Sequence, residues 1–304
     1  MSVFLVPDGL DGERVDAGAA RMTGWSRSRL GEHIVAGQVL VDGAIVTKAS
    51  QRIRSGQMIE IHEMALREAV VVPHLADGLR VVFIDDAQVV VDKPAGVAAH
   101  PSLGWDGPDV LAHLAAAGIS VAAVGAAERG GIVQRLDVGT SGLMVVARTN
   151  EAYTSLKRQF RAHSVVKTYQ AVVQGHPDPP RGTIDMPIGR AEAGGWRFAV
   201  REDGRPSVTH YDTVELMRGA ALLAVQLETG RTHQIRVHMA ALRHPIVGDP
   251  LYGSDPVLAV RLHLDRQWLH AIYLSFEHPV TMQRVEFTSE PSPDLQSALE
   301  ILRG

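Results

Sequence analysis

The segment GIVQRLDVGTSGLMVVART, residues 131–149, places a single carboxylate between two apolar runs. Asp137 stands where a predicted strand gives way to a sharp polar loop, and Gly139 and Gly142 permit backbone angles that other residues avoid. A carboxylate at such a point can act as a nucleophile or as a general base. The same pattern fits an ordinary turn aspartate that bonds its own backbone, so the segment alone leaves both interpretations open.

Several other chemistries lack their signatures in this sequence. Ser141 is not set in the G-x-S-x-G spacing of a serine hydrolase. No glycine-rich run ends in Gly-Lys-Ser/Thr, and no dinucleotide fingerprint appears. The chain has no cysteine, and His233, His238 and His244 show no known zinc spacing. We therefore expect no metal site.

The composition is that of an ordinary globular protein rather than a membrane protein. The chain has 304 residues, which predicts about two domains, and 45% of them are hydrophobic. The longest apolar runs, such as residues 143–147, have the length of a strand and are far too short to span a membrane. The first residues lack a basic start and a long apolar core, so we expect no export signal and a cytoplasmic location.

Three stretches are locally basic although the formal net charge is −4. Phosphate contacts depend on local potential, so net charge alone does not exclude a nucleic-acid partner. Solvated helix faces would explain any one stretch, but the three together favour RNA. They are residues 17–31 with Arg21, Arg27 and Arg29, residues 148–170 with five Arg or Lys against Glu151, and residues 229–245 with Arg231, Arg236 and Arg243.

Residues 13–65 show the pattern of a small α/β unit. Two short helices are predicted over 13–36, followed by apolar runs around Asp42-Gly43, a strong signal for a tight hairpin, and by a strand at 57–63. This block resembles the S4 RNA-binding domain, although a small subdomain without a ligand would give a similar pattern. Residues 67–78 read as a linker. We therefore predict an S4-like domain over 1–72 and a second domain over 73–304.

Beyond the linker, the sequence is rich in strands and poor in regular strand–helix alternation. This favours an α+β fold around a mostly antiparallel mixed sheet. The predicted strands are 81–85, 89–93, 143–147, 165–173, 208–216 and 221–228, and the predicted helices are 110–118, 150–163 and 238–243.

The second domain resembles the RluA-type pseudouridine synthases. RLDVGTSGLMVVA (135–147) looks like their catalytic motif, in which the aspartate after Arg-Leu is the essential residue. Further motifs follow in the order of the family: VDKPAGVAAHPS (91–102) comes before it, and KTYQAVVQG (167–175), LETGRTHQIRVHMAALRHPIVGDPLYG (227–253) and WLHAIYLSFEHP (268–279) come after it. The S4-like block extends the resemblance to bacterial members that modify ribosomal RNA.

This resemblance implies an enzyme that isomerises uridine to pseudouridine in structured RNA, most often of the large ribosomal subunit. It also implies a sheet with a central RNA-binding cleft, a monomeric protein and no cofactor, because the substrate supplies every atom of the product. Asp137 would attack C1′ or C6, or remove the 2′ proton, and the sequence does not choose among these. Which uridine is modified is also not encoded in any readable pattern, because RNA shape decides it.

Several further residues acquire roles by the same resemblance. Arg236 would form an ion pair with Asp137 and keep it ionised, with Arg231 as a second candidate or as a phosphate contact. Tyr169 would stack on the flipped base, and Ile235 would pack on the uracil; on pattern alone both are core residues. Arg135 would fill the gap in the RNA, Lys93 would contact phosphate or lie in a surface loop, and His233, His238 and His244 would contact RNA or pack against the strand.

One position departs from the family, and it supports an alternative function. Gln134 stands where the family usually has histidine, and glutamine cannot titrate. If that position only orients its neighbours, activity survives. If it acts as an acid, the chain would be an impaired synthase that serves as an RNA-binding or ribosome-assembly factor. A synthase acting on transfer RNA is a further alternative, whereas a small-molecule hydrolase would leave the S4-like block unexplained.

Overall fold

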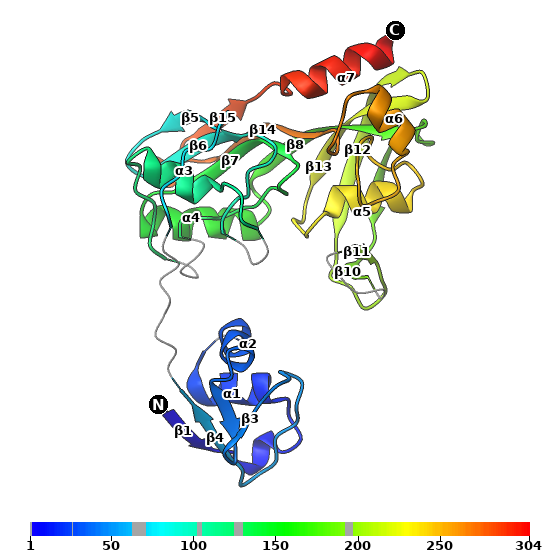
Figure 1. Ribbon diagram of the computed structural model, residues 1–304. Helices are drawn as coiled ribbons and strands as arrows, with labels where there is room; N and C mark the ends of the chain where they lie inside the picture. The colour runs from blue at the N-terminus through cyan, green and yellow to red at the C-terminus, as the bar shows by residue number, and fades with distance from the viewer. Residues whose placement is uncertain (1, 26, 63–70, 102–104, 125–129, 192–196) are drawn as a thin grey trace. The chain divides into compact units, whose positions relative to one another are not determined.

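The computed structural model describes residues 2–25, 27–62, 71–101, 105–124, 130–191 and 197–304 (Figure 1). Contacts divide the chain into two compact units, Met1–Val70 and Val71–Gly304. Residues 71–78 were predicted as linker, but they pack on the second unit: the amide of His74 donates to the carbonyl of Ala112 at 3.1 Å, and Ala76 is buried. The second unit therefore begins within the predicted linker, whose residues 67–70 lie outside the described residues.

The first unit contains the two helices and the hairpin that the sequence predicts. Asp42 and Gly43 both have positive φ, 51° and 76°, as a two-residue turn of this kind requires. A four-stranded antiparallel sheet, ordered β1-β4-β2-β3, packs with the helices around Leu30, Ile53 and Ile59. The elements are β1 (Ser2–Leu5), η1 (Asp8–Leu10), α1 (Val15–Thr23), α2 (Arg27–Val35), β2 (Val39–Val41), β3 (Ala44–Ile45) and β4 (Met58–Ile61).

The second unit is built on a nine-stranded sheet ordered β5-β6-β7-β14-β8-β13-β12-β9, with β15 paired to β14. Among the described strands only β7 and β14 pair in parallel, which confirms a mostly antiparallel mixed sheet and an α+β fold. The strands are β5 (Arg80–Ile84), β6 (Gln88–Lys93), β7 (Ser141–Ala147), β8 (Val166–Gln174), β9 (Arg181–Asp185), β12 (Val208–Met217), β13 (Ala220–Leu227), β14 (Leu269–Glu277) and β15 (Arg284–Thr288), and a separate hairpin joins β10 (Ile188–Arg190) to β11 (Phe198–Val200).

Both faces of the sheet are covered where β6 and β7 lie, which explains why their sequences are continuously apolar. Val89 and Val91 of β6 belong to the larger core, and Val90 between them belongs to a smaller core that includes Leu156 of α4. The helices of this unit are α3 (Val110–Ala116), α4 (Asn150–Arg161), α5 (Gln234–Ala241), α6 (Pro256–Arg261) and α7 (Pro293–Arg303).

Two local predictions were wrong near the site. Residues 131–136 were expected to form a strand, but their pairing is a single bridge between Ile132 and Val146, after which the chain runs as an irregular loop to Asp137. The helix expected at 238–243 begins at Gln234 and ends at Ala241. Its start was missed because three of its polar residues, Gln234, Arg236 and His238, are buried and break the apolar pattern of an amphipathic helix.

Candidate active site

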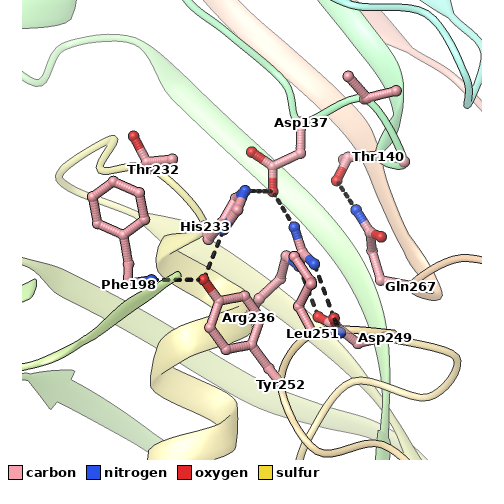
Figure 2. A network of polar contacts seen from close by, with 12 residues as sticks. Asp137, Thr140, Phe198, Thr232, His233, Arg236, Asp249, Leu251, Tyr252 and Gln267 are labelled. Carbon is pink, nitrogen blue, oxygen red and sulfur yellow. Dashed lines mark hydrogen bonds and ion pairs between the residues drawn. The ribbon is translucent and has the colours of Figure 1, made fainter. Parts of the chain in front are cut away.

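A cleft of about 1170 Å³ opens beside Asp137. Its walls come from the loop at 132–140, from β8, from the start of α5 and from the turn between α4 and β8. Segments far apart in the sequence therefore meet at one carboxylate, and Figure 2 shows the polar contacts around it. The volume exceeds the range typical of sites for small ligands, so the cleft has room for a larger substrate.

The loop after Asp137 is fixed by the segment that leads into β14. The guanidinium of Arg266 donates to the carbonyl of Gly139 at 3.2 Å, and the amide of Gln267 donates to the hydroxyl of Thr140 at 3.0 Å. A Cβ added at Gly139 would lie 2.6 Å from Oε1 of Gln267, so a side chain there would displace the amide that donates to Thr140. The turn that follows Asp137 is therefore closely packed.

Gly142 permits the parallel pairing that brings β14 to this loop. Its φ is 113°, and an added Cβ would lie 2.4 Å from the carbonyl oxygen of Ala271. A larger residue at this position would push β14 away from β7. Glycine is thus favoured at positions 139 and 142 for different reasons: the first lies against the side chain of Gln267 and the second against the backbone of Ala271.

Arg236 forms the ion pair with Asp137 that the sequence predicted. Its Nη1 lies 3.1 Å from Oδ2 of Asp137, while its Nε and Nη2 bond both carboxylate oxygens of Asp249 at 2.7 and 2.9 Å. The ring of Tyr252 lies 5.0 Å below the guanidinium. Burial by itself would lower the pKa of Arg236, but the hydrogen bond to Asp249 and the charge of Asp137 raise it above its usual value, so the cation persists.

Asp249 and Tyr252 were not identified from the sequence as site residues. Both lie in the GDPLYG run that closes the second signature, at 248–253, and that run is the signal that would have led to them. The side chain of Asp249 is fully buried, so this carboxylate fixes the orientation of Arg236 rather than facing the cleft.

Tyr169 and Ile235 line the cleft and also belong to the large core. They are only 8% and 4% exposed, so the two interpretations of these residues are compatible. Burial, with a smaller effect of the Asp137 charge, raises the pKa of Tyr169, and the phenol therefore stays neutral. An apolar surface next to a carboxylate is suitable for a planar base.

Arg135, Arg231 and Gln134 also line the cleft. Arg135 is exposed and donates to the hydroxyl of Thr232 at 3.3 Å. Arg231 donates to the carbonyl of Pro206 at 3.1 Å and is not paired with Asp137, so the ion pair belongs to Arg236 alone of the two candidates. The amide of Gln134 donates to the carbonyl of Leu143 at 3.3 Å, which orients its side chain along the start of β7.

Lys93 corrects a prediction. It was expected to contact phosphate or to lie in a surface loop, but it is fully buried, and its ammonium donates to the carbonyls of Pro94 and Val97 at 2.9 and 2.7 Å. A third carbonyl, that of Val138, lies 3.4 Å away. Burial lowers the pKa of Lys93 to about 7, with the negative charge of Asp137 acting in the opposite direction. Its position suits a residue that stabilises the Asp137 loop.

A basic wall of the cleft was visible in the sequence only as a charged stretch. This wall is formed by the second half of α4, the turn after it and the start of β8. Its residues at the cleft are Lys157, Arg161, His163 and Lys167. The lysines and the arginine of this wall, together with Arg135 and Arg231, line the cleft with basic side chains, as a polyanionic substrate requires.

The profile of the RNA pseudouridylate synthase family matches residues 87–241, which contain Asp137, Tyr169 and Arg236. The chain belongs to this family. It is therefore an RNA pseudouridine synthase, with RNA as its substrate. An S4 domain profile matches residues 13–59 within the first unit.

Similar proteins span almost the whole chain. A Mycobacterium bovis protein described as an uncharacterized RNA pseudouridine synthase is 54% identical, over 98% of this chain and 97% of its own length. The ribosomal large subunit pseudouridine synthase D of Xanthomonas campestris is 40% identical, over 98% and 92%. Among solved structures, human RNA pseudouridylate synthase domain containing 1 is similar with a TM-score of 0.60 and 28% identity, covering 74% of this chain and 89% of its own.

The arginines predicted to contact RNA in the first unit are partly paired. Arg21 lies 3.3 Å from Glu13, and Arg27 lies 2.8 Å from Asp16, acids that come just before the basic stretch or at its edge. Their side chains remain 65% and 58% exposed. The backbone of Arg29 belongs to α2, but its side chain lies outside what the structure describes.

The buried histidine His238 has a structural role. Its Nε2 donates to the carbonyl of Met186 at 2.9 Å, so its Nδ1 accepts from the hydroxyl of Thr209 at 2.8 Å.

The part of the chain that the structure describes contains no group of three or more side chains arranged for a metal ion. Among the described helices none has the length and apolar character needed to cross a bilayer.

Proposed function

We propose that this synthase modifies large-subunit ribosomal RNA and that Asp137 is its essential carboxylate. The observation that carries the role of Asp137 is its ion pair with the buried Arg236 at the edge of an open basic cleft. The target class is supported by full-length similarity to relatives described as ribosomal large subunit pseudouridine synthases and by the S4 match.

The reaction breaks the bond between N1 and C1′, turns the uracil and joins C5 to C1′. The proton that leaves C5 is balanced by one that N1 gains, so the product has the atoms of the substrate. Asp137 can attack C1′ or C6, or remove the 2′ proton, and each of these roles needs the ionised form. Arg236 places a positive charge 3.1 Å from this carboxylate.

The other cleft residues fit the binding of a nucleotide turned out of its helix. Tyr169 and Ile235 form the apolar surface for the base. Arg135 is exposed near Asp137 and suits the gap that the base leaves in the RNA, while Arg231 and the basic wall suit the flanking phosphates. Lys93 is buried and donates to backbone carbonyls, so we assign it to stabilising the Asp137 loop and not to binding RNA.

Mapping pseudouridines in ribosomal and transfer RNA, from cells with and without the gene, tests the target. We expect at least one site in large-subunit RNA to disappear and to return when the wild-type gene is restored. Disappearance of sites in transfer RNA alone would contradict the proposed target. Unchanged pseudouridines in both classes, with tight RNA binding by the protein, would favour an assembly factor.

Gln134 is proposed to orient the start of β7 rather than to titrate. We therefore expect Gln134→His to leave single-turnover activity on the mapped RNA within about threefold of the wild type, because neither side chain would transfer a proton. A gain of about a thousandfold would contradict this role and would identify the natural chain as an impaired enzyme.

The first unit is proposed to add a second RNA contact. Deleting residues 1–70 removes that unit and leaves Val71, which packs on the second core. We expect weaker binding to large-subunit RNA and a smaller dependence of Kd on salt, while turnover of a saturating short stem-loop changes little. Kd measured against salt concentration for both proteins checks this.

A charge variant separates electrostatics from loss of the whole unit. Changing Arg21 and Arg27 to Gln leaves the unit in place. If both side chains contact phosphates, the slope of log Kd against log salt concentration should fall by about two. Equal salt slopes for the full-length, truncated and double-variant proteins would exclude RNA contact by this unit.

We further propose that the protein acts as a monomer in the cytoplasm, where ribosomal RNA is made in bacteria such as those of its relatives. Light scattering during size-exclusion chromatography tests the monomer, and a stable dimer would contradict it.

A further inference from the structure

His233 is placed beside Asp137 by an unusual backbone conformation. It precedes the first residue of α5 with φ 56°, in the left-handed region that residues other than Gly, Asn and Asp seldom occupy. A residue at this position often caps the helix with its side chain, but His233 makes no such bond. Its ring lies instead among Asp137, Tyr252 and Phe198 (Figure 2).

The neighbours of His233 favour one of its two neutral tautomers. The amide of Phe198 donates to the hydroxyl oxygen of Tyr252 at 3.1 Å, and Nδ1 of His233 lies 2.7 Å from that oxygen. With one acceptor position used by Phe198, the Tyr252 hydroxyl is available to donate its own proton to Nδ1 of His233. A neutral ring that accepts at Nδ1 carries its proton on Nε2, the nitrogen that faces Asp137.

Charges around the ring are consistent with the neutral form. Burial lowers the pKa of His233, and the effect of Asp137 in the opposite direction does not overcome it. Burial also raises the pKa of Tyr252, so its hydroxyl keeps the proton that it donates. The charged groups that face His233 are Asp137, Arg236, Asp249 and Arg135.

The two oxygens of Asp137 are not equivalent. Oδ2 lies 3.1 Å from Nη1 of Arg236 and 3.9 Å from Nε2 of His233. Oδ1 has no hydrogen bond to any residue that the structure describes, and the Asp137 side chain is 24% exposed. The distance from Nε2 is too long for a hydrogen bond, but a closure of about 1 Å on RNA binding would form one.

We propose that His233 and Tyr252 form a positioning pair: Tyr252 fixes the tautomer of His233, and His233 Nε2–H anchors Oδ2 of Asp137, which leaves Oδ1 as the reacting oxygen. This inference rests on the proposed role of Asp137. A neutral donor suits the task, because a second full cation beside Arg236 would stabilise the carboxylate further and weaken it as a nucleophile or base.

Tyr252→Phe tests the pair with a small change. The ring over Arg236 is kept, and the hydroxyl that contacts His233 and accepts from the amide of Phe198 is lost. At saturating RNA we expect kcat to fall by about tenfold to a hundredfold, the effect of one hydrogen bond to a charged group, with KM within about twofold. A fall in kcat without a rise in KM distinguishes a loss of positioning from a loss of RNA binding.

A second substitution and a matched control distinguish positioning from packing. His233→Gln keeps a donor near the place of Nε2 and should retain more activity than His233→Leu. Tyr211→Phe removes another buried hydroxyl, which donates to the carbonyl of Pro179 at 3.1 Å. Tyr211 does not line the cleft, so this substitution should leave kcat and its pH profile unchanged. Thermal unfolding of every variant shows whether a loss of activity reflects a loss of fold.

The tautomer itself can be measured without any turnover. Long-range 1H–15N NMR spectra of the histidine rings, assigned with His233→Gln, should show His233 protonated at Nε2 alone in the wild type and a mixture of tautomers in Tyr252→Phe. A proton on Nδ1 in the wild type, or a folded His233→Leu variant with wild-type kcat, would overturn the proposal. If the wild type fails to turn over any RNA, the proposed function fails, while the NMR result still decides the tautomer.

Discussion

Replacing Asp137 with Asn is expected to reduce pseudouridine formation by at least about ten-thousandfold, because the amide keeps the volume but cannot attack carbon or accept a proton. RNA affinity should stay within about threefold, since the phosphate contacts of the cleft are unchanged. The fold should survive, because Arg236 keeps its two bonds to Asp249. Single-turnover release of tritium from C5-labelled uridine in RNA, with Kd from filter binding, measures both quantities.

The control for this experiment is another carboxylate of the same cleft. Asp265 lines the cleft and is exposed, so Asp265→Asn changes the local charge by the same amount. We expect it to leave turnover within about threefold. Activity of Asp137→Asn within tenfold of the wild type would exclude Asp137 as the essential carboxylate, and an equal loss in Asp265→Asn would point to charge rather than chemistry.

Replacing Arg236 with Met is expected to lower both activity and stability. The substitution leaves the buried carboxylate of Asp249 without its partner, which costs about 3–5 kcal/mol of unfolding free energy. It also removes the cation beside Asp137, so turnover should fall by at least about a hundredfold even under conditions where the variant is folded. Urea denaturation and single-turnover rates below the transition check the two effects.

A double variant separates these two roles of Arg236. Adding Asp249→Asn removes the unpaired charge and keeps an oxygen that can accept from the amide of Leu251, as Asp249 does at 2.9 Å. We expect it to recover about 2 kcal/mol of the lost stability and none of the activity. Recovery of activity together with stability would mean that Arg236 acts only through the fold, and an unchanged stability would contradict the charge explanation.

The parts of the fold that the sequence predicted are those with a strong local signal. The Asp42-Gly43 turn needs two residues that tolerate positive φ, and the apolar runs of β6 and β7 are long enough to identify buried strands. Residues 131–136 have a similar apolar start, but β7 offers them only one bridge, so the expected strand does not form. Pairing partners are a tertiary property that a local pattern cannot supply.

The site was predictable where a motif names the residue and not where burial decides its role. The ion pair of Arg236 and Asp137 was expected from the family pattern and is present. Lys93 was expected to contact phosphate or to lie in a surface loop, because it begins a Lys-Pro-Ala-Gly turn. The sequence does not show the three carbonyls that converge on its ammonium and explain why this lysine is buried. His233 depends on a left-handed backbone angle at a position where the sequence shows no glycine.

The position of β14 in the sheet has a consequence for the timing of synthesis. This strand, Leu269–Glu277, lies between β7 and β8 and joins the two halves of the sheet, and Arg266 and Gln267 just before it hold the loop of Asp137. Domains fold during translation from the N-terminus onward, so the first unit can form while these residues are still untranslated. A nascent chain on the ribosome can thus contain the S4 region before it has a complete cleft, and a message cut short before residue 266 lacks the residues that hold the Asp137 loop.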